Sequence, residues 1–317
     1  MFGVLWEYAP RLVFWVHDGK ELDLVTTTSP QRQAAVRPIV EGIQRDPTFS
    51  GAALRTLELA GDPSVKVEQL SHAIVADAAL LARVQKLASS PICGFDRRVA
   101  SFEHAVALLG FGAVRSVCAA AGLMGLFRVP NCGRWFSTRA FWLHSLTTAT
   151  AGKLINDRVR AAPSDQVLLG GLIHDVGHLV LAQARPDEFC RMLEMIEFDE
   201  NGVPSQDMRD VELDIFGADH CDFGAALCEA WKLPDCYTLA AAHHHTPLQV
   251  SVFSKLPGVV HVADLLACHW VPGFRGDLLG TDVTPDVVKM LGLRQKDLED
   301  INNELKDLLP DIHWMLT

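Results

Sequence analysis

Apolar residues recur at steps of three and four along most of the chain, which is the period of an amphipathic helix. Between Arg37 and Phe127 these positions are Leu54, Leu57, Leu70, Ile74, Leu80, Leu81, Val84 and Leu87. Asp62-Pro63-Ser64 supplies a turn between the first two segments, and Ser101 supplies a helix start. The pattern predicts roughly five helices in this region.

A second helical region follows a short polar link at residues 128–134. Its apolar runs predict helices over residues 141–156, 164–184, 186–198, 222–231, 237–245 and 256–268. The last segment, residues 285–309, carries one apolar stripe formed by Leu298, Ile301, Leu305 and Leu308. Such a stripe packs more often on its own domain than on a second chain, so a homodimer through this face is the less favoured alternative.

The first 30 residues break the helical pattern. Two apolar stretches, 12–17 and 20–25, flank Asp18-Gly19, a dipeptide typical of the tight turn of a β-hairpin. A hairpin alone is barely stable. It must therefore pack on the main body, pair with another strand, or be the remnant of a sensory module that this chain lacks.

The predicted fold class is all-α, in two helical halves, with a short N-terminal β-hairpin. The predicted divisions are a hairpin and linker (1–36), a helical domain (37–309) with halves 37–128 and 135–309, and a C-terminal tail (310–317).

Composition fits this picture and excludes some partners. The chain is 49% hydrophobic and 21% charged, as in ordinary globular proteins, and its formal net charge is -11. An acidic chain lacks the cations that displace counterions from nucleic acids or bind anionic membranes, so we expect neither as a partner. The most apolar window, residues 105–127, is interrupted at Leu109-Gly110-Phe111-Gly112, which favours two buried helices over a membrane span.

The eight cysteines show no Cys-x-x-Cys pair and no regular spacing. We expect reduced, mostly buried thiols. No signal peptide pattern opens the chain either, so the expected location is the cytoplasm.

The strongest chemical signal is His174-Asp175, an imidazole and a carboxylate side by side in an apolar run. On a helix, adjacent side chains are about 100° apart and can share a metal ion. The alternative is a buried histidine that is hydrogen-bonded by its neighbour. The other histidines favour a metal site at this pair, because nine of the thirteen fall between His144 and His269.

The order of these residues resembles that of HD-type metal phosphohydrolases: His144, then His174-Asp175, then His220 with Gly224, then His244-His245, then Asp264. Other motifs are similar to the HDOD branch, the "HD-related output domain" of bacterial signalling proteins. They are Val75-Ala76-Asp77-Ala78-Ala79-Leu80, Ser101-Phe102-Glu103-His104-Ala105-Val106, Glu212, Gly217-Ala218-Asp219-His220, Ala230-Trp231-Lys232-Leu233-Pro234 and His244-His245-Thr246-Pro247. The resemblance covers residues 38–309.

This resemblance implies a ligand set. His144, His174, Asp175 and Asp264 would hold a first divalent metal, with Asp175 bridging to a second that is completed by His220, His244 and His245. Imidazoles and carboxylates suit Fe, Mn, Zn or Ni, whereas an all-oxygen magnesium site does not fit so many nitrogens. No other cofactor is expected.

Each ligand has a structural alternative. His144 would otherwise be a core histidine, and His220 would cap the helix that follows it. Three consecutive histidines cannot all face one centre, so we expect His243 to be exposed. Four histidines are interpreted as structural, capping or surface residues: His72, His104, His261 and His269.

Two departures from the catalytic HD-GYP branch argue against chemistry. No Gly-Tyr-Pro motif follows His244-His245, and His178 stands where those enzymes place a lysine. His178 would be the catalytic cation only when protonated. The favoured function is therefore a non-catalytic signalling module that binds a protein or small ligand, with a vestigial metal site. The alternative is a metal-dependent phosphohydrolase acting on a nucleotide or cyclic dinucleotide.

Overall fold

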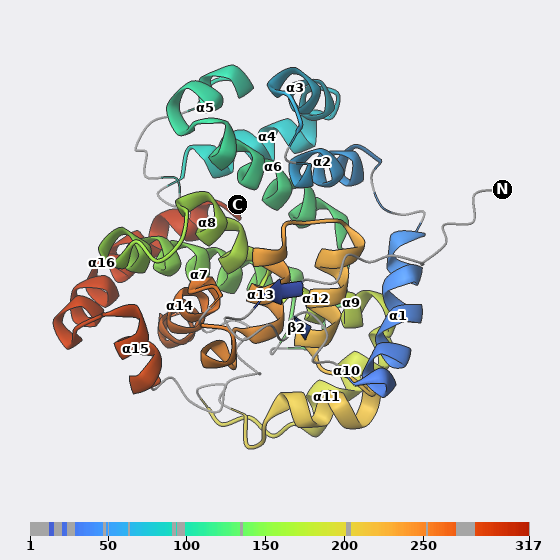
Figure 1. Cartoon of the computed structure of the whole chain (residues 1–317). Helices are drawn as coiled ribbons and strands as arrows, with labels where there is room; N and C mark the ends of the chain where they lie inside the picture. Colours follow the sequence, from blue (N-terminus) through green and yellow to red (C-terminus); the bar gives the residue numbers. More distant parts are fainter. Residues whose placement is uncertain are drawn as a thin grey trace.

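The computed structural model describes residues 13–15, 21–23, 29–46, 49, 51–62, 64–90, 93, 99–133, 136–200, 204–251, 253–270 and 283–316. These residues are almost wholly helical (Figure 1), which confirms the all-α prediction. Two short strands, β1 (Val13–Trp15) and β2 (Glu21–Asp23), pair antiparallel. The Asp18-Gly19 turn between them lies outside the described residues, so the hairpin stays a prediction.

The amino-terminal helices wrap around one central helix. They are α2 (Gly51–Gly61), α3 (Val67–Val75), α4 (Ala78–Ala88), α5 (Phe102–Leu109) and α6 (Phe111–Leu126). Helix α6 contacts the other four, and the predicted apolar positions Leu57, Leu70 and Leu80 are buried between them. The break predicted in the apolar window 105–127 is present at Gly110, whose φ of 78° separates α5 from α6.

Helix α1 (Pro30–Gln44) does not join this group. It lies against α9 and α12 of the other half, as Figure 1 shows, and buries Val36, Val40 and Ile43. Its Arg32 pairs with Asp219 at 3.2 Å and with Asp222 at 2.9 Å. The chain therefore crosses from the second half to the first after α1, and residues 37–44 pack on the second half.

The second half is built around the long helix α7. Its helices are α7 (Thr138–Val159), α8 (Ser164–Ile173), α9 (Val176–Ala184), α10 (Pro186–Met195), α11 (Met208–Phe216), α12 (His220–Ala230), α13 (Asp235–His243), the 3-10 turn η2 (Pro247–Gln249), α14 (Leu256–Trp270), α15 (Pro285–Leu291) and α16 (Gln295–Trp314). Helices α8, α14 and α16 all pack on α7. The predicted stripe on α16 is covered by α7, with Ile301 and Leu305 completely buried, so it packs on its own domain.

One predicted helix is wrong in an instructive way. Residues 164–184 do not form a single helix, because α8 ends at Ile173 and α9 begins at Val176, with His174 and Asp175 in the turn between them. The apolar pattern runs through this turn unchanged and so could not show it. The stretch is apolar enough to cross a membrane by length and composition, but 89% of its most apolar window is buried inside the protein.

Two glycines allow helices to touch backbone to backbone near this turn. A Cβ atom on Gly171 would lie 2.7 Å from the Cα atom of Ala149, so α7 and α8 could not approach as they do. A Cβ atom on Gly177 would overlap the carbonyl oxygen of His220, which fixes α12 against α9. Both contacts hold potential ligands close together, because His174 follows Gly171 and His220 begins α12.

The prediction that all cysteines are reduced is wrong for one pair. Cys132 and Cys190 form a disulfide, with Cα atoms 5.0 Å apart, that joins the link before α7 to α10. The two residues are 58 positions apart, and nothing in their spacing indicates that the fold brings them together. The other six cysteines form no disulfide in the part of the chain that the structure describes: Cys93, Cys118, Cys221, Cys228, Cys236 and Cys268.

The Gly171 contact predicts a stability effect. We expect Gly171→Ala to lower the free energy of unfolding by about 1–3 kcal/mol, because a methyl group would force two helix backbones apart. Gly42→Ala is the matched control, since its Cβ would meet nothing within 4 Å on the exposed side of α1. That variant should gain up to about 0.5–1 kcal/mol. Urea denaturation measures both, and equal stabilities would contradict the inferred close contact.

Candidate metal centre

The seven residues predicted as metal ligands meet at one place. His144 comes from α7, His174 and Asp175 from the α8–α9 turn, His220 from α12, and Asp264 from α14. His244 and His245 directly follow α13 and complete the group. Six of the seven are at most 1% exposed, and His245 is half-buried. Residues up to 120 positions apart therefore form a single polar cluster inside an apolar core.

The first subset has the spacing of ligands around one ion. The Nε2 atom of His144 lies 3.3 Å from Nε2 of His174 and 3.1 Å from Oδ1 of Asp264. Asp175 contributes Oδ2, which lies 3.1 Å from Nε2 of His174. Ligand atoms that are each about 2.0–2.2 Å from a metal ion lie about 3 Å from one another. These four side chains can thus hold one divalent ion.

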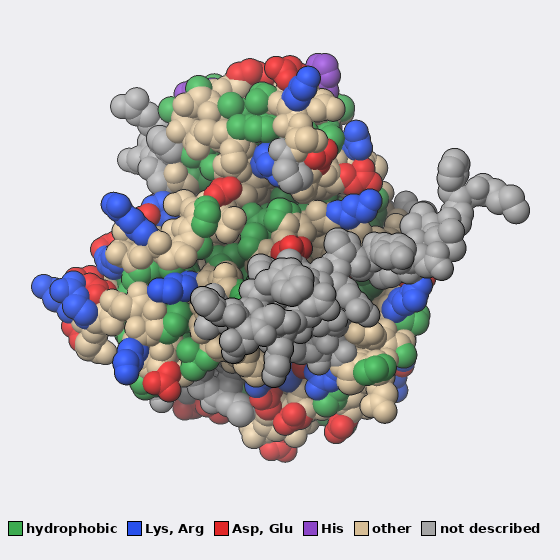
Figure 2. Space-filling view, in the orientation of Figure 1, with side chains coloured by type: hydrophobic (Ala, Val, Ile, Leu, Met, Phe, Trp, Pro, Cys, Tyr) green, Lys and Arg blue, Asp and Glu red, His purple; other side chains and the backbone are tan. Residues whose placement is uncertain are grey.

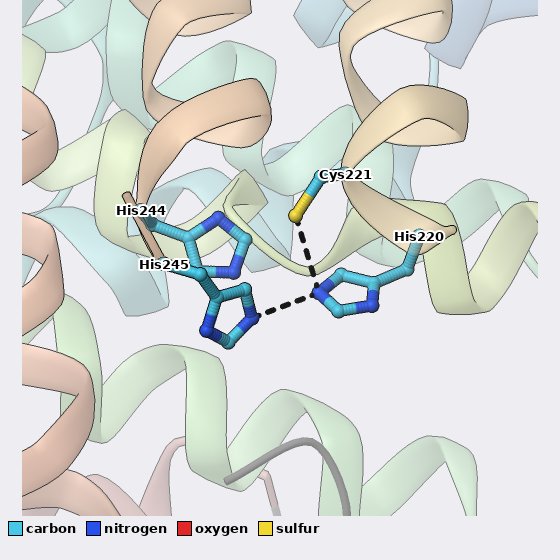
Figure 3. A group of neighbouring side chains, drawn as sticks. All are labelled: His220, Cys221, His244 and His245. Atoms are coloured by element: carbon cyan, nitrogen blue, oxygen red, sulfur yellow. Dashed lines mark hydrogen bonds between the residues drawn. The ribbon is translucent and has the colours of Figure 1, made fainter. Parts of the chain in front are cut away.

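The second subset lies on the other side of Asp175. Its Oδ1 atom is 3.2 Å from Nε2 of His244 and 3.8 Å from Nε2 of His220. Figure 3 shows the rings of His220 and His245 turned toward each other, with their Nε2 atoms 3.1 Å apart. One carboxylate therefore faces both subsets, as expected of a ligand that bridges two ions.

Hydrogen bonds at the far side of three rings fix which nitrogen faces the centre. The Nδ1 atom of His174 donates to the carbonyl oxygen of Gly171 at 2.9 Å, and Nδ1 of His244 donates to that of Ala241 at 3.0 Å. Nδ1 of His220 donates to Glu212 at 2.8 Å. A neutral imidazole with a proton on Nδ1 has its lone pair on Nε2. Each Nε2 atom is thus oriented as a metal ligand.

The cluster fits a cation because its acceptors face one another. Both carboxylate oxygens of Asp175, and Nε2 of His244, are buried without a hydrogen-bond donor among the described residues. Burying such groups unpaired costs free energy, which either protons or metal ions must offset. Without metal, protons serve: burial lowers the pKa of His174, but Asp175 and Asp264 outweigh it and raise this pKa to about 10.

Glu212, one of the residues that resemble the HDOD motifs, positions the ring of His220. It is completely buried on α11, and its Oε2 accepts hydrogen bonds from both Nδ1 and the backbone N–H of His220. Its Oε1 lies 3.0 Å from Nδ1 of His178. Burial raises the pKa of Glu212, but His220 and His178 outweigh it and hold this pKa well below its usual range. Glu212 thus sets the orientation of a predicted ligand.

His178 does not occupy the place of a catalytic cation. Its ring is completely buried, stacks on that of His220 with centroids 4.0 Å apart, and turns Nδ1 toward Glu212. It therefore lies buried beside His220 and Asp175, with ligand atoms of the three residues within 4.8 Å of one another, and not at the surface, where a substrate phosphate would arrive.

The remaining histidines are placed by the same geometry. His243 was expected to be exposed, but it is only 5% exposed, because it is the last residue of α13 and is buried with that helix. His261 has a structural place: its Nδ1 donates to the carbonyl oxygen of His244, and its Nε2 lies 2.9 Å from the Thr284 hydroxyl. His220 does not cap α12, since Asp219 does so through its side chain.

Comparison with known proteins identifies the family. Residues 47–247 match the model of the HDOD domain, which is more than half of the chain. The chain belongs to the HDOD family. The match ends before Asp264, so the last ligand of the first subset lies outside it.

Solved structures share the fold over most of the chain. An HDOD domain protein of unknown function from Geobacter sulfurreducens is 26% identical, with a TM-score of 0.68, and the match covers 90% of this chain and 97% of that one. A putative phosphohydrolase from Shewanella amazonensis SB2B is 19% identical, with a TM-score of 0.65, over 88% and 98% of the two chains. A putative signal transduction protein from Marinobacter aquaeolei VT8 is 24% identical, with a TM-score of 0.63, over 93% and 69%.

One curated relative also matches. An uncharacterized protein of Treponema pallidum (strain Nichols) is 22% identical over 247 residues. The match covers 76% of this chain but only 45% of that relative's length. This chain therefore spans less than half of that relative's length.

The position of Glu212 predicts selective loss of the second metal. Glu212→Ala removes the acceptor that orients His220, and we expect the affinity for the second ion to fall about 10–100-fold while the first ion is retained. Asp214→Ala, which removes an exposed carboxylate from the same helix, is the control. Titration of chelator-treated protein with zinc, followed by calorimetry, measures both steps. Unchanged affinity in Glu212→Ala would show that the His220 ring binds the second ion without its hydrogen bond to Glu212.

The raised pKa of His174 predicts that metal binding releases protons. A group with a pKa of about 10 is protonated at neutral pH, so an ion must displace its proton to bind. Apparent affinity should rise with pH by about tenfold per unit for each proton released. A pH indicator in weak buffer counts these protons, and His174→Ala should release fewer. An affinity that stays constant between about pH 6 and about pH 9 would show that metal binding displaces no proton from His174.

Proposed function

We propose that this chain is a bacterial signalling module that holds divalent metal in its core and acts by binding a partner protein or small ligand, without hydrolysing phosphoesters. The observation that carries the proposal is the burial of a complete ligand set. Six of the seven ligands are at most 1% exposed, so the centre is built to be held by the protein rather than offered to a substrate.

The arrangement of positive charge supports the same conclusion. When bound, a divalent ion lowers the pKa of a water ligand and neutralises phosphate oxygens, which is the chemistry that a hydrolase needs. A hydrolase also needs an accessible cation for the scissile phosphate. The candidate at that position, His178, is buried and directed at Glu212. The metal then serves to fix five helical elements relative to one another.

A metal-dependent phosphohydrolase acting on a nucleotide or cyclic dinucleotide is the second candidate. It is supported by Asp175, whose two oxygens face the two subsets as in a dinuclear site, and by the partial exposure of His245. Two ions bridged in this way would clamp a phosphate. The name of the Shewanella relative, a putative phosphohydrolase, agrees with this candidate at the level of fold.

The proposed partner is neither nucleic acid nor membrane. The net charge is -11, and on the face that Figure 2 shows, Lys and Arg side chains are interspersed with Asp and Glu. A protein surface or a small ligand is therefore the proposed partner, and self-association through a second copy stays an untested alternative. The cytoplasm stays the proposed location, although the Cys132–Cys190 disulfide is more typical of an oxidising compartment.

Metal content and turnover separate the two candidates. We expect the protein as purified to contain about two equivalents of Fe, Mn, Zn or Ni, and to leave a panel of nucleotides and cyclic dinucleotides intact. Asp175→Ala should lose both ions, because its carboxylate faces both subsets, whereas Asp187→Ala, an exposed change on α10, should lose neither. Turnover that disappears in Asp175→Ala would establish the hydrolase instead. If the purified protein contained no metal, neither candidate function could include a bound ion.

A further inference from the structure

A thiol lies among the second subset of ligands. Cys221 follows His220 at the start of α12, and Figure 3 shows its sulfur directed toward the rings of His220, His244 and His245. The Sγ atom is 3.5 Å from Nε2 of His220, and the four ligand atoms all lie within 4.8 Å of one another. No sequence motif marked this residue, because the HD ligand pattern contains only histidine and aspartate.

The spacing matches a tetrahedral ion. In such a site, sulfur lies about 2.3 Å and nitrogen about 2.0–2.1 Å from zinc, which separates these two ligand atoms by roughly 3.6 Å. The Sγ atom of Cys221 lies 3.5 Å from Nε2 of His220, and the Nε2 atoms of His220 and His245 lie 3.1 Å apart. The buried Nε2 of His244, which has no hydrogen-bond donor, supplies an independent sign that a cation belongs here.

We propose that Cys221 is a ligand of the second ion, so that this half of the centre is a His-His-His-Cys site for zinc or a similarly thiophilic ion. The inference rests on the proposed metal-holding function and deepens it. These four residues would surround the second ion together with Oδ1 of Asp175, which lies 3.2 Å from Nε2 of His244, and would leave no place for substrate. Structural zinc sites are closed in this way, whereas catalytic sites keep a position open for water or substrate.

A second cysteine near the centre has a different geometry. Cys268 lies 3.9 Å from Nδ1 of His144 and 3.8 Å from Oδ1 of Asp264. Nδ1 is not the nitrogen that His144 turns toward the other ligands, since its Nε2 contacts His174 and Asp264. The sulfur of Cys268 thus lies next to the nitrogen of His144 that faces away from the first subset, and it does not belong to the group of ligand atoms there, whereas Cys221 belongs to the group formed with His220, His244 and His245. Cys228, two turns further along α12, is buried in the apolar core.

Cobalt(II) reports a thiolate ligand directly, because thiolate-to-cobalt charge transfer absorbs in the near ultraviolet and imidazole or carboxylate ligation does not. The full chain is stripped with a chelator, loaded with cobalt(II), and its bound cobalt and absorption spectrum are measured. We expect about two bound ions and a charge-transfer band in the wild type. Cys221→Ser should lose the band, whereas Cys228→Ser and Cys268→Ser should keep it.

The outcomes distinguish this inference from the function on which it rests. Bound cobalt without the band, or a band that survives Cys221→Ser, overturns the Cys221 ligand and leaves the metal-holding module intact. Phosphoester turnover by protein that shows the band overturns the non-catalytic function alone, and failure to bind cobalt overturns both. If Cys221→Ser does not fold, the band in wild type, Cys228→Ser and Cys268→Ser still supports Cys221, and loss of the band in Cys268→Ser assigns it to that residue.

Discussion

The structure of the second half depends on one unfavourable contact: the negative carboxylate of Asp175 is completely buried and faced by imidazole nitrogens on both sides. A buried charge is tolerated only when it is paired, and here the partners are lone pairs unless a proton or metal ion lies between them. Asp175 also stands at the amino-terminal end of α9, where the helix dipole favours a negative charge. The surrounding helices are placed so that this charge can be compensated.

Close packing makes the compensation possible. Gly171 lets α8 approach α7, and Gly177 lets α9 approach the first residue of α12, so that ligands from separate helices come within one coordination distance. Glu212 then holds the ring of His220 by two hydrogen bonds, and His261 binds the backbone of His244. The centre is therefore supported by residues that would not themselves touch a metal, which is how proteins keep ligand rings in a fixed orientation.

The same contacts bear on whether a bound metal ion could act on a substrate. A hydrolase leaves a coordination position and a cation open to its substrate, whereas here the nearby His178 is completely buried and its Nδ1 lies 3.0 Å from Oε1 of Glu212. Metal ligation across α7, α12 and α14 would instead link three helices from separate parts of the chain. A module that transmits a signal needs such a link, because a change at one helix can reach the others only through rigid contacts.

The sequence by itself determined the helical class and most helix positions, because the period of apolar residues is a local property that survives in any packing. It also named seven candidate metal ligands, because their order along the chain resembles a family pattern. Only the tertiary structure decided which residues far apart in the chain are neighbours. That information settled five features: the turn at His174 and Asp175, the Cys132–Cys190 disulfide, the inward packing of His243, the support by Glu212 and the place of Cys221. Each of these features depends on how side chains pack in the folded protein. Packing follows the shapes of the side chains, which the order of residues along the chain does not show.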